Sequence, residues 1–185
     1  MNLNLTARQR NYLISVGVVL ILGLVFFLIN RAMGPGGATT VGSHQFGVQT
    51  KTSGCKAHSG LPDSACTPGA LLSTGTKSAI CKSGYASSVR NVPDSEKNQD
   101  YAEYGITSHA TGEYEVDHLV SLELGGSNDI ANLWPELANP TPGFHQKDQV
   151  ENYLHDQVCS GAISLSDAQV EIATNWLSVY QRMPK

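Results

Sequence analysis

The segment that decides the fold runs from Glu115 to Glu136 and reads EVDHLVSLELGGSNDIANLWPE. It places Asp117 and His118 side by side in a stretch that carries valine and leucine at partly alternating positions. Such a pattern favours a β-strand, which we expect over residues 113–123, running into a turn at Gly125-Gly126. The sequence therefore predicts a carboxylate and an imidazole next to each other on one strand of a hairpin.

The residues on either side complete an α+β pattern. Ile130 to Pro135 predicts the returning strand, and residues 137–143, LANPTPG, form a loop by composition. A helix is expected from Phe144 to Val158, because apolar residues recur on one face at about 100° per residue. Two more helices are expected, over residues 95–104 and 167–182.

The N-terminal part carries a different signal. Tyr12 to Ile29 is an uncharged apolar run of eighteen residues, about the minimum that a helix needs to cross a bilayer. We therefore expect residues 1–31 to be a transmembrane anchor or a signal sequence, and both readings export the rest of the chain. Residues 32–60 are expected to be a flexible linker, and residues 61–185 the folded domain.

The cysteine content agrees with export. Four cysteines in a small domain outside the cytoplasm predict two disulfides, and three pairings are open. A zinc site is disfavoured, because no C-x-x-C pair occurs and the spacings are wide. The four candidates are Cys55, Cys66, Cys81 and Cys159.

Charge is distributed unevenly along the exported part. Residues 44–92 carry five Lys and Arg against one Asp, a net charge of +4, whereas residues 93–185 carry four against fifteen acidic residues, a net charge of −11. If these two parts pack together, a basic wall faces an acidic cation site. A chance distribution over a solvated surface is the alternative.

Strand, turn, strand and helix is an order in which a site for phosphodiester hydrolysis with one metal ion can be assembled. That reaction needs a nucleophile made from water, and a cation that neutralises charge on the phosphate and the departing oxygen. An imidazole suits the proton transfer, since its unperturbed pKa is about 6.5, and a carboxylate with a second imidazole can hold the metal. Asp117, His118 and His145 supply these groups.

The order of Asp-His, Gly-Gly, NLWP and HQKD in this chain resembles that of the HNH endonucleases. The resemblance implies a small ββα-metal core with flanking helices, and here a disulfide-stapled N-terminal part. It implies Asp117 as a metal ligand and His118 as the general base. It also implies Asn132 as the residue that fixes the loop and orients His118, and His145 as the second metal ligand.

Motifs in the flanks narrow the resemblance to an exported bacterial subgroup of that superfamily. They are CTPGA, AICKSGY, SVR and LHDQVCSG, and the resemblance covers roughly residues 61–180. A longer loop before the helix than in compact members leaves the helix ligand open. His155 and Asn152 are substitutes for His145, and Asp148 is a candidate third ligand.

Strand geometry adds one condition. Successive side chains on a regular strand point to opposite faces, so Asp117 and His118 face one site only if the strand bends or ends near residue 117.

The resemblance implies a metal-dependent endonuclease that hydrolyses DNA, or RNA, with low sequence specificity outside the cytoplasm. One divalent ion is expected, Mg²⁺ before Mn²⁺, Zn²⁺ or Ni²⁺, with Arg90 and Lys147 as candidate phosphate contacts. The alternative is a non-catalytic, membrane-anchored module that binds nucleic acid or a partner on the same scaffold. Membrane contact is expected through the N-terminal helix, and no protein partner can be inferred.

Overall fold

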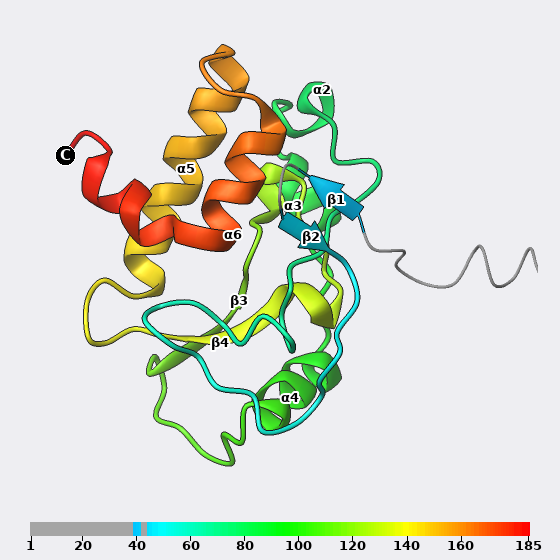
Figure 1. Ribbon diagram of the computed structural model, residues 1–185, viewed down its shortest axis with the longest axis vertical. Coiled ribbons are helices and arrows are strands. Elements are labelled where there is room, and N and C mark those ends of the chain that lie inside the picture. Colours follow the sequence, from blue (N-terminus) through cyan, green and yellow to red (C-terminus); the bar gives the residue numbers. More distant parts are fainter. Residues whose placement is uncertain (1–38, 42–43) are drawn as a thin grey trace, which may run out of the picture. The chain divides into compact units, whose positions relative to one another are not determined.

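The computed structural model describes residues 39–41 and 44–185 of the chain (Figure 1). The expected membrane anchor at Tyr12 to Ile29 lies outside these residues, as does the first part of the expected linker. In the described part, no helix is both long and apolar enough to span a bilayer.

The described residues form a mixed α+β domain, which confirms the predicted class. A hairpin of β1 and β2 is followed by three short helices, a second hairpin of β3 and β4, and two long helices (Figure 1). Their bounds, in chain order, are β1 Thr39–Val41, β2 His44–Phe46, α2 Lys77–Ile80, α3 Tyr85–Val89, α4 Asp94–Glu103, β3 Tyr114–His118, β4 Leu133–Leu137, α5 Phe144–Ser160 and α6 Leu165–Arg182. The three helices predicted from sequence correspond to α4, α5 and α6.

Strand β3 ends earlier than its hydrophobic pattern predicts. It pairs antiparallel with β4, Asp117 opposite Trp134 and His118 opposite Leu133. Beyond His118 the chain turns into the 3₁₀ helix η1, Leu122–Leu124, and it returns through a second one, η2, Ile130–Asn132.

A tight turn explains this early end. Gly125 has φ of 77°, and a Cβ added at Gly126 would strike the Val120 carbonyl, so no side chain fits at that position. The chain therefore folds back on itself where the sequence predicts a longer strand.

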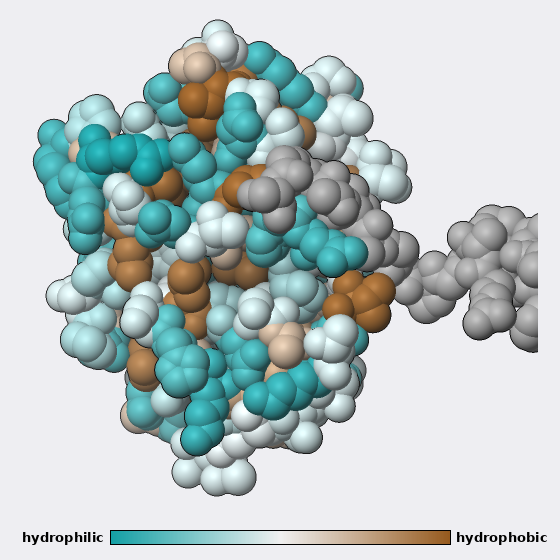
Figure 2. All heavy atoms as spheres, viewed as in Figure 1, coloured by the Kyte–Doolittle hydropathy of each residue, from teal (hydrophilic) through white to brown (hydrophobic). Residues whose placement is uncertain are grey.

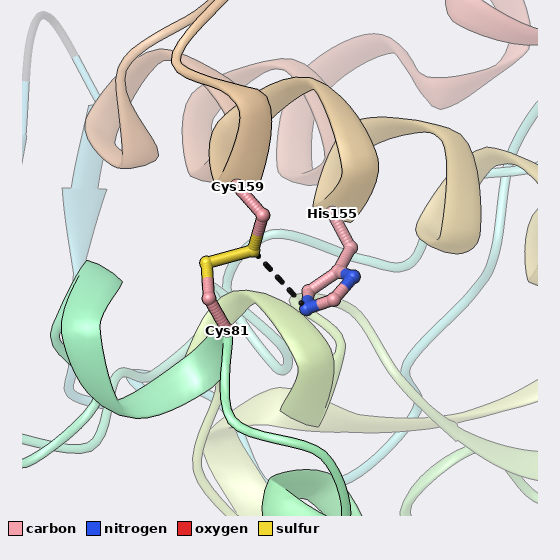
Figure 3. Close-up of side chains that lie close together, drawn as sticks. All are labelled: Cys81, His155 and Cys159. Atoms are coloured by element: carbon pink, nitrogen blue, oxygen red, sulfur yellow. Dashed lines mark hydrogen bonds between the residues drawn. A yellow bond between two sulfur atoms is a disulfide. The ribbon is translucent and has the colours of Figure 1, made fainter.

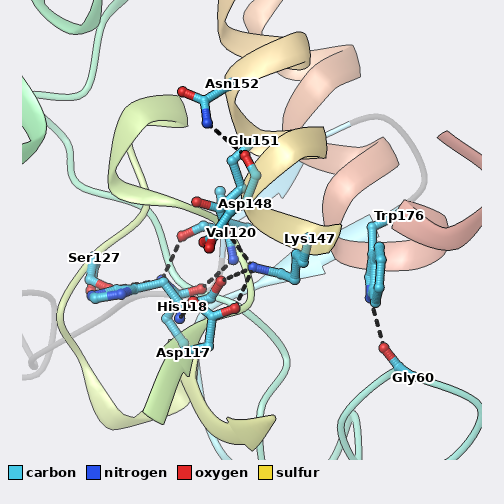
Figure 4. A network of polar contacts seen from close by, with 11 residues as sticks. Gly60, Asp117, His118, Val120, Ser127, Lys147, Asp148, Glu151, Asn152 and Trp176 are labelled. Atoms are coloured by element: carbon cyan, nitrogen blue, oxygen red, sulfur yellow. Dashed lines mark hydrogen bonds and ion pairs between the residues drawn. The ribbon is translucent and has the colours of Figure 1, made fainter. Parts of the chain in front are cut away.

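The core lies around helices α5 and α6. These helices pack against each other and against η1, while α4 packs on the β3–β4 hairpin (Figure 1). Trp134 and Trp176, predicted as core residues, are 2% and 0% exposed. The indole Nε1 of Trp176 donates to the Gly60 carbonyl at 2.7 Å, which ties α6 to the N-terminal part of the domain (Figure 4).

Two disulfides form, which confirms the prediction from the cysteine count and resolves their pairing. Cys55 bonds to Cys66, and Cys81 bonds to Cys159. The first closes a short loop in the N-terminal part, and the second ties the end of α2 to the last turn of α5. Disulfides persist in oxidising environments outside the cytoplasm.

Residues 44–60, which the sequence assigns to the linker, pack on the domain. Phe46 is 1% exposed and belongs to the hydrophobic core. Gly47 donates from its backbone N–H to Gly69 O at 2.8 Å, and Cys55 donates in the same way to Glu103 O at 3.0 Å. Part of the Gly- and Ser-rich segment is therefore a structured strap.

The surface is mixed in character. On the face shown in Figure 2, hydrophobic residues are scattered among hydrophilic ones. Among the described residues, the exposed large hydrophobic side chains are Val48 and Leu137, which are 55% and 40% exposed.

Candidate functional site

The carboxylate of Asp117 lies at the C-terminal end of β3 and is engaged on both oxygens. Oδ1 accepts from the His118 backbone N–H at 2.7 Å, and Oδ2 accepts from Lys147 Nζ at 2.8 Å. Burial opposes ionisation of Asp117, yet the ammonium of Lys147 outweighs it and holds the pKa of that carboxyl below its usual range. Asp117 is therefore an anion inside the domain.

Lys147, expected from sequence to contact phosphate, is instead completely buried on the first turns of α5. Its side chain is 0% exposed, and its Nζ donates to Asp117 Oδ2 and His118 O, each at 2.8 Å, and to Glu151 Oε1 at 2.5 Å (Figure 4). Although burial disfavours the ammonium, Asp117 and Glu151 raise its pKa. All three donors are used, so Lys147 links α5 to the end of β3 and does not reach a surface.

Glu136 joins the same network from β4. It is 2% exposed, and neither of its oxygens accepts a hydrogen bond. Burial raises the pKa of Glu136 to about 10, with the charge of Asp117 adding to the shift, so the group is protonated at neutral pH. Sequence reasoning missed both Glu136 and Glu151. The i,i+4 spacing of Lys147 and Glu151 was the available signal for the second.

His118 follows Asp117 and is a neutral imidazole. Its side chain is buried, the residue being 3% exposed, and burial lowers its pKa to about 4 even though Asp117 opposes the shift. A neutral imidazole has one nitrogen that carries a proton and one that can accept a proton.

Asn128, a residue that the sequence analysis did not identify, determines which ring nitrogen of His118 carries the proton. Its Oδ1 accepts from the Asn91 backbone N–H at 3.1 Å, and its Nδ2 donates to Val89 O at 2.8 Å. Because a backbone N–H only donates and a carbonyl only accepts, these contacts fix the orientation of the amide. Oδ1 lies 3.3 Å from His118 Nε2, so Nε2 carries the proton and Nδ1 keeps its lone pair.

Asn132 holds the loop between the strands. It is fully buried, and its Oδ1 accepts from Val120 N at 2.9 Å and from Ala70 N at 3.3 Å. Its Nδ2 donates to Val120 O at 2.9 Å and to Ser127 O at 2.7 Å. These four bonds fix the backbone at Val120 and Ser127, so Asn132 holds the loop that follows His118, while Asn128 contacts the His118 ring.

Two of the candidate metal ligands are exposed on α5. His145 and Asp148 lie in the first turns of this helix, and the His145 ring packs on Phe144 with centroids 4.2 Å apart. Partial burial and the charge of Asp117 raise the pKa of Asp148, while Lys147 and His145 oppose the shift. Asp148 therefore lies within electrostatic range of both Asp117 and His145.

Glu115 and Arg90 belong to the same surroundings. Partial burial and the charges of Asp117 and Asp148 raise the pKa of Glu115, and Arg90 opposes that shift. The site is thus a group of carboxylates with Arg90 as its accessible cation.

The two substitute ligands lie elsewhere on α5. Asn152 is exposed, and its Nδ2 donates to Asp148 O within the helix at 2.8 Å. His155 contacts Ile80 O at 3.1 Å and Cys159 Sγ at 3.5 Å (Figure 3). The structure therefore places His155 against the second disulfide rather than beside Asp117.

The donors around Asp117 fit a hard divalent cation held partly by water. Among residues 39–41 and 44–185, the one set of three His, Cys, Asp or Glu side chains with ligand atoms all within 4.8 Å is Cys81, His155 and Cys159. Asp117 with Asp148 or His145 is not such a cage. Mg²⁺, however, is usually held by one or two carboxylates together with waters and substrate phosphates. Asp117 accepts two hydrogen bonds, and a carboxylate has about four lone-pair sites.

Three comparisons, against protein-family models, curated proteins and solved structures, found no match to this chain.

Proposed function

We propose that the domain is a metal-dependent phosphodiester hydrolase that acts on nucleic acid in the manner of the HNH endonucleases. The observation that carries the proposal is the state of the His118 side chain. Its imidazole is neutral, its Nε2–H donates to Asn128 Oδ1, and its Nδ1 keeps a lone pair that can accept a proton. It stands next to an ionised carboxylate where a strand of a ββα unit ends. That is the arrangement of a base beside a metal ligand.

Each residue then has a distinct task. Nδ1 of His118 takes a proton from water that attacks phosphorus, while Nε2 stays bonded to Asn128. Asp117 would hold a divalent ion together with Asp148 or His145, and that ion would neutralise charge on the phosphate and the departing oxygen. Lys147 holds Asp117 in place from inside the domain.

Nucleic acid is the substrate class that the proposal names, DNA first and RNA second. Arg90 lies within electrostatic range of Asp148 and Glu115 and would contact a phosphate of the backbone. Phosphate contacts carry no base information, so low sequence specificity follows. The disulfides support action outside the cytoplasm. Membrane attachment through residues 12–29 remains part of the proposal.

The alternative, a non-catalytic binding module on the same scaffold, is favoured by burial. Asp117 and His118 are 9% and 3% exposed, and the Asp117 oxygens are already engaged by Lys147 and a backbone N–H. A module of this kind would bind nucleic acid or a partner without hydrolysing anything.

Cleavage assays separate these functions. The full chain in mild detergent, with disulfides intact, would be incubated with supercoiled plasmid, single-stranded DNA and RNA, in Mg²⁺ and in EDTA. The proposal predicts cleavage that needs the metal and leaves fragments without a fixed sequence pattern. Metal-independent binding without cleavage would favour the binding module.

A further inference from the structure

A second cluster of metal-binding groups lies away from Asp117. Cys81 follows α2, and Cys159 and His155 lie one helical turn apart near the end of α5. One ligand atom from each lies within 4.8 Å of the others, and His155 Nε2 is 3.5 Å from Cys159 Sγ (Figure 3). Two sulfurs and one imidazole nitrogen are the donors that zinc prefers.

While the disulfide is formed, neither sulfur is a thiolate, and the cluster cannot hold a metal. The two segments are nevertheless held together by more than the S–S bond. His155 Nε2 donates to Ile80 O at 3.1 Å, one residue before Cys81. Ile80 is 2% exposed and belongs to the same core cluster as Leu154 and Val158 of α5. Reduction therefore leaves the three donors close to one another.

The His155 Nδ1 atom makes no hydrogen bond within the described part of the chain; the nearest carboxylate oxygen, Asp156 Oδ1, is 3.8 Å away on an exposed side chain. Cys81 and His155 also line a cavity of about 560 Å³, together with Glu123. Glu123 Oε2 is buried and has no hydrogen-bond partner, which makes it the candidate for a fourth ligand.

We propose that Cys81, Cys159 and His155 bind one zinc ion when the Cys81–Cys159 disulfide is reduced. This site is independent of the proposed hydrolase site. Where the disulfide has already formed, a dithiol reductant attacks one sulfur, forms a mixed disulfide, and closes to its own cyclic disulfide, which leaves two cysteine thiols. Zinc binding then releases both thiol protons. The imidazole stays neutral: its proton moves from Nε2 to Nδ1, and the freed Nε2 lone pair binds the metal.

The site would be filled in a chain that has not yet been exported, where thiols stay reduced. It would be emptied outside the cytoplasm, when exchange with an oxidised dithiol protein forms the Cys81–Cys159 disulfide, reduces that protein to two thiols and releases the metal ion. Metal and disulfide are thus alternative cross-links between the same two segments.

The test uses the full chain in mild detergent, treated with a phosphine reductant, which does not compete for metal as a dithiol does. Co²⁺ is the probe, since thiolate ligation gives it a charge-transfer band, and Zn²⁺ then displaces it. We expect one ion per reduced chain and none in the oxidised chain.

Matched variants keep the result interpretable. The Cys55→Ser/Cys66→Ser chain should bind as the wild type does, because that cysteine pair lies outside the three-donor cluster. The Cys81→Ser/Cys159→Ser chain should not bind, and His155→Gln should bind much more weakly. Two results would overturn the proposal. One is metal binding that persists in the chain without Cys81 and Cys159. The other is a reduced wild-type chain that gives no thiolate band with Co²⁺, whether or not that chain stays folded.

Discussion

Lys147 Nζ lies 2.8 Å from Asp117 Oδ2, and this buried ion pair joins helix α5 to the end of strand β3. The pair does not stand alone, since the same ammonium also holds Glu151 and the His118 carbonyl. The position of the proposed base is therefore coupled to the position of α5, the helix that carries the proposed second metal ligand.

Removing the ammonium should be costly. Lys147→Met leaves the Asp117 carboxylate without its counter-ion in a buried setting, and breaking such a pair costs about 3–5 kcal/mol of folding free energy. Urea denaturation measures the loss. The matched control is Lys97→Met, which removes an exposed pair with Asp94 and should change stability by less than about 1 kcal/mol. Equal effects of the two substitutions would contradict the role assigned to Lys147.

Glu136 provides a separate test of the network's protonation. Because its pKa is raised to about 10, Glu136 is neutral at pH 7, and Glu136→Gln replaces a neutral carboxyl group by a neutral amide of similar size. The substitution should change the free energy of unfolding by no more than about 1 kcal/mol. A much larger loss at neutral pH would mean that Glu136 is ionised and paired in the native state.

Asn128 should control the tautomer of His118. In the wild-type chain, ¹⁵N NMR shifts of the His118 ring should show a protonated Nε2 and an unprotonated Nδ1. Asn128→Ala should mix the tautomers and lower kcat by about 10- to 100-fold with little change in KM, as for other groups that orient a functional imidazole. Asn98→Ala, an exposed amide on α4, is the control. An Nδ1–H tautomer in the wild type would refute the assignment, whether or not the chain is a nuclease.

Asp100 should make stability depend on pH. It is 1% exposed, and burial raises its pKa to about 8, against 3.8 for an unperturbed side chain. The folded state therefore keeps a proton that the unfolded state has lost, so stability falls as pH rises from about 4 to 8.

Asp100→Asn should remove that dependence. The variant should gain up to about 5 kcal/mol over the wild type near pH 9, and little near pH 4. Denaturation midpoints at both pH values measure the difference, with exposed Asp94→Asn as the control. A variant that is no more stable at the higher pH would show that Asp100 ionises freely in the folded state.

Helix periodicity and the cysteine count predicted the main helices and the number of disulfides of this domain. Apolar periodicity gave α5 because Val150, Leu154 and Val158 form its buried face, and all three are at most 1% exposed. The cysteine count predicted two disulfides but not their pairing, which depends on the distance between α2 and α5 in the folded chain.

The interior of the candidate site could not be predicted in the same way. A lysine after a histidine at a helix start indicates a surface cation, because lysines are almost never fully buried unless paired. Lys147 is buried since Asp117 comes from a strand thirty residues earlier in the chain, a contact that no local pattern reveals. Asn128 was missed for the same reason, because its orientation depends on backbone groups of Val89 and Asn91.

The most direct test of the account is the single-turnover cleavage rate of the full, disulfide-intact chain in Mg²⁺, compared with that of His118→Ala. The matched control is His109→Ala, an exposed histidine that packs on Tyr101. The account predicts metal-dependent cleavage of DNA that falls by about two to four orders of magnitude in His118→Ala and is unchanged in His109→Ala. A wild-type chain that binds DNA but does not cleave it, or a His118→Ala variant that cleaves as fast as the wild type, would contradict it.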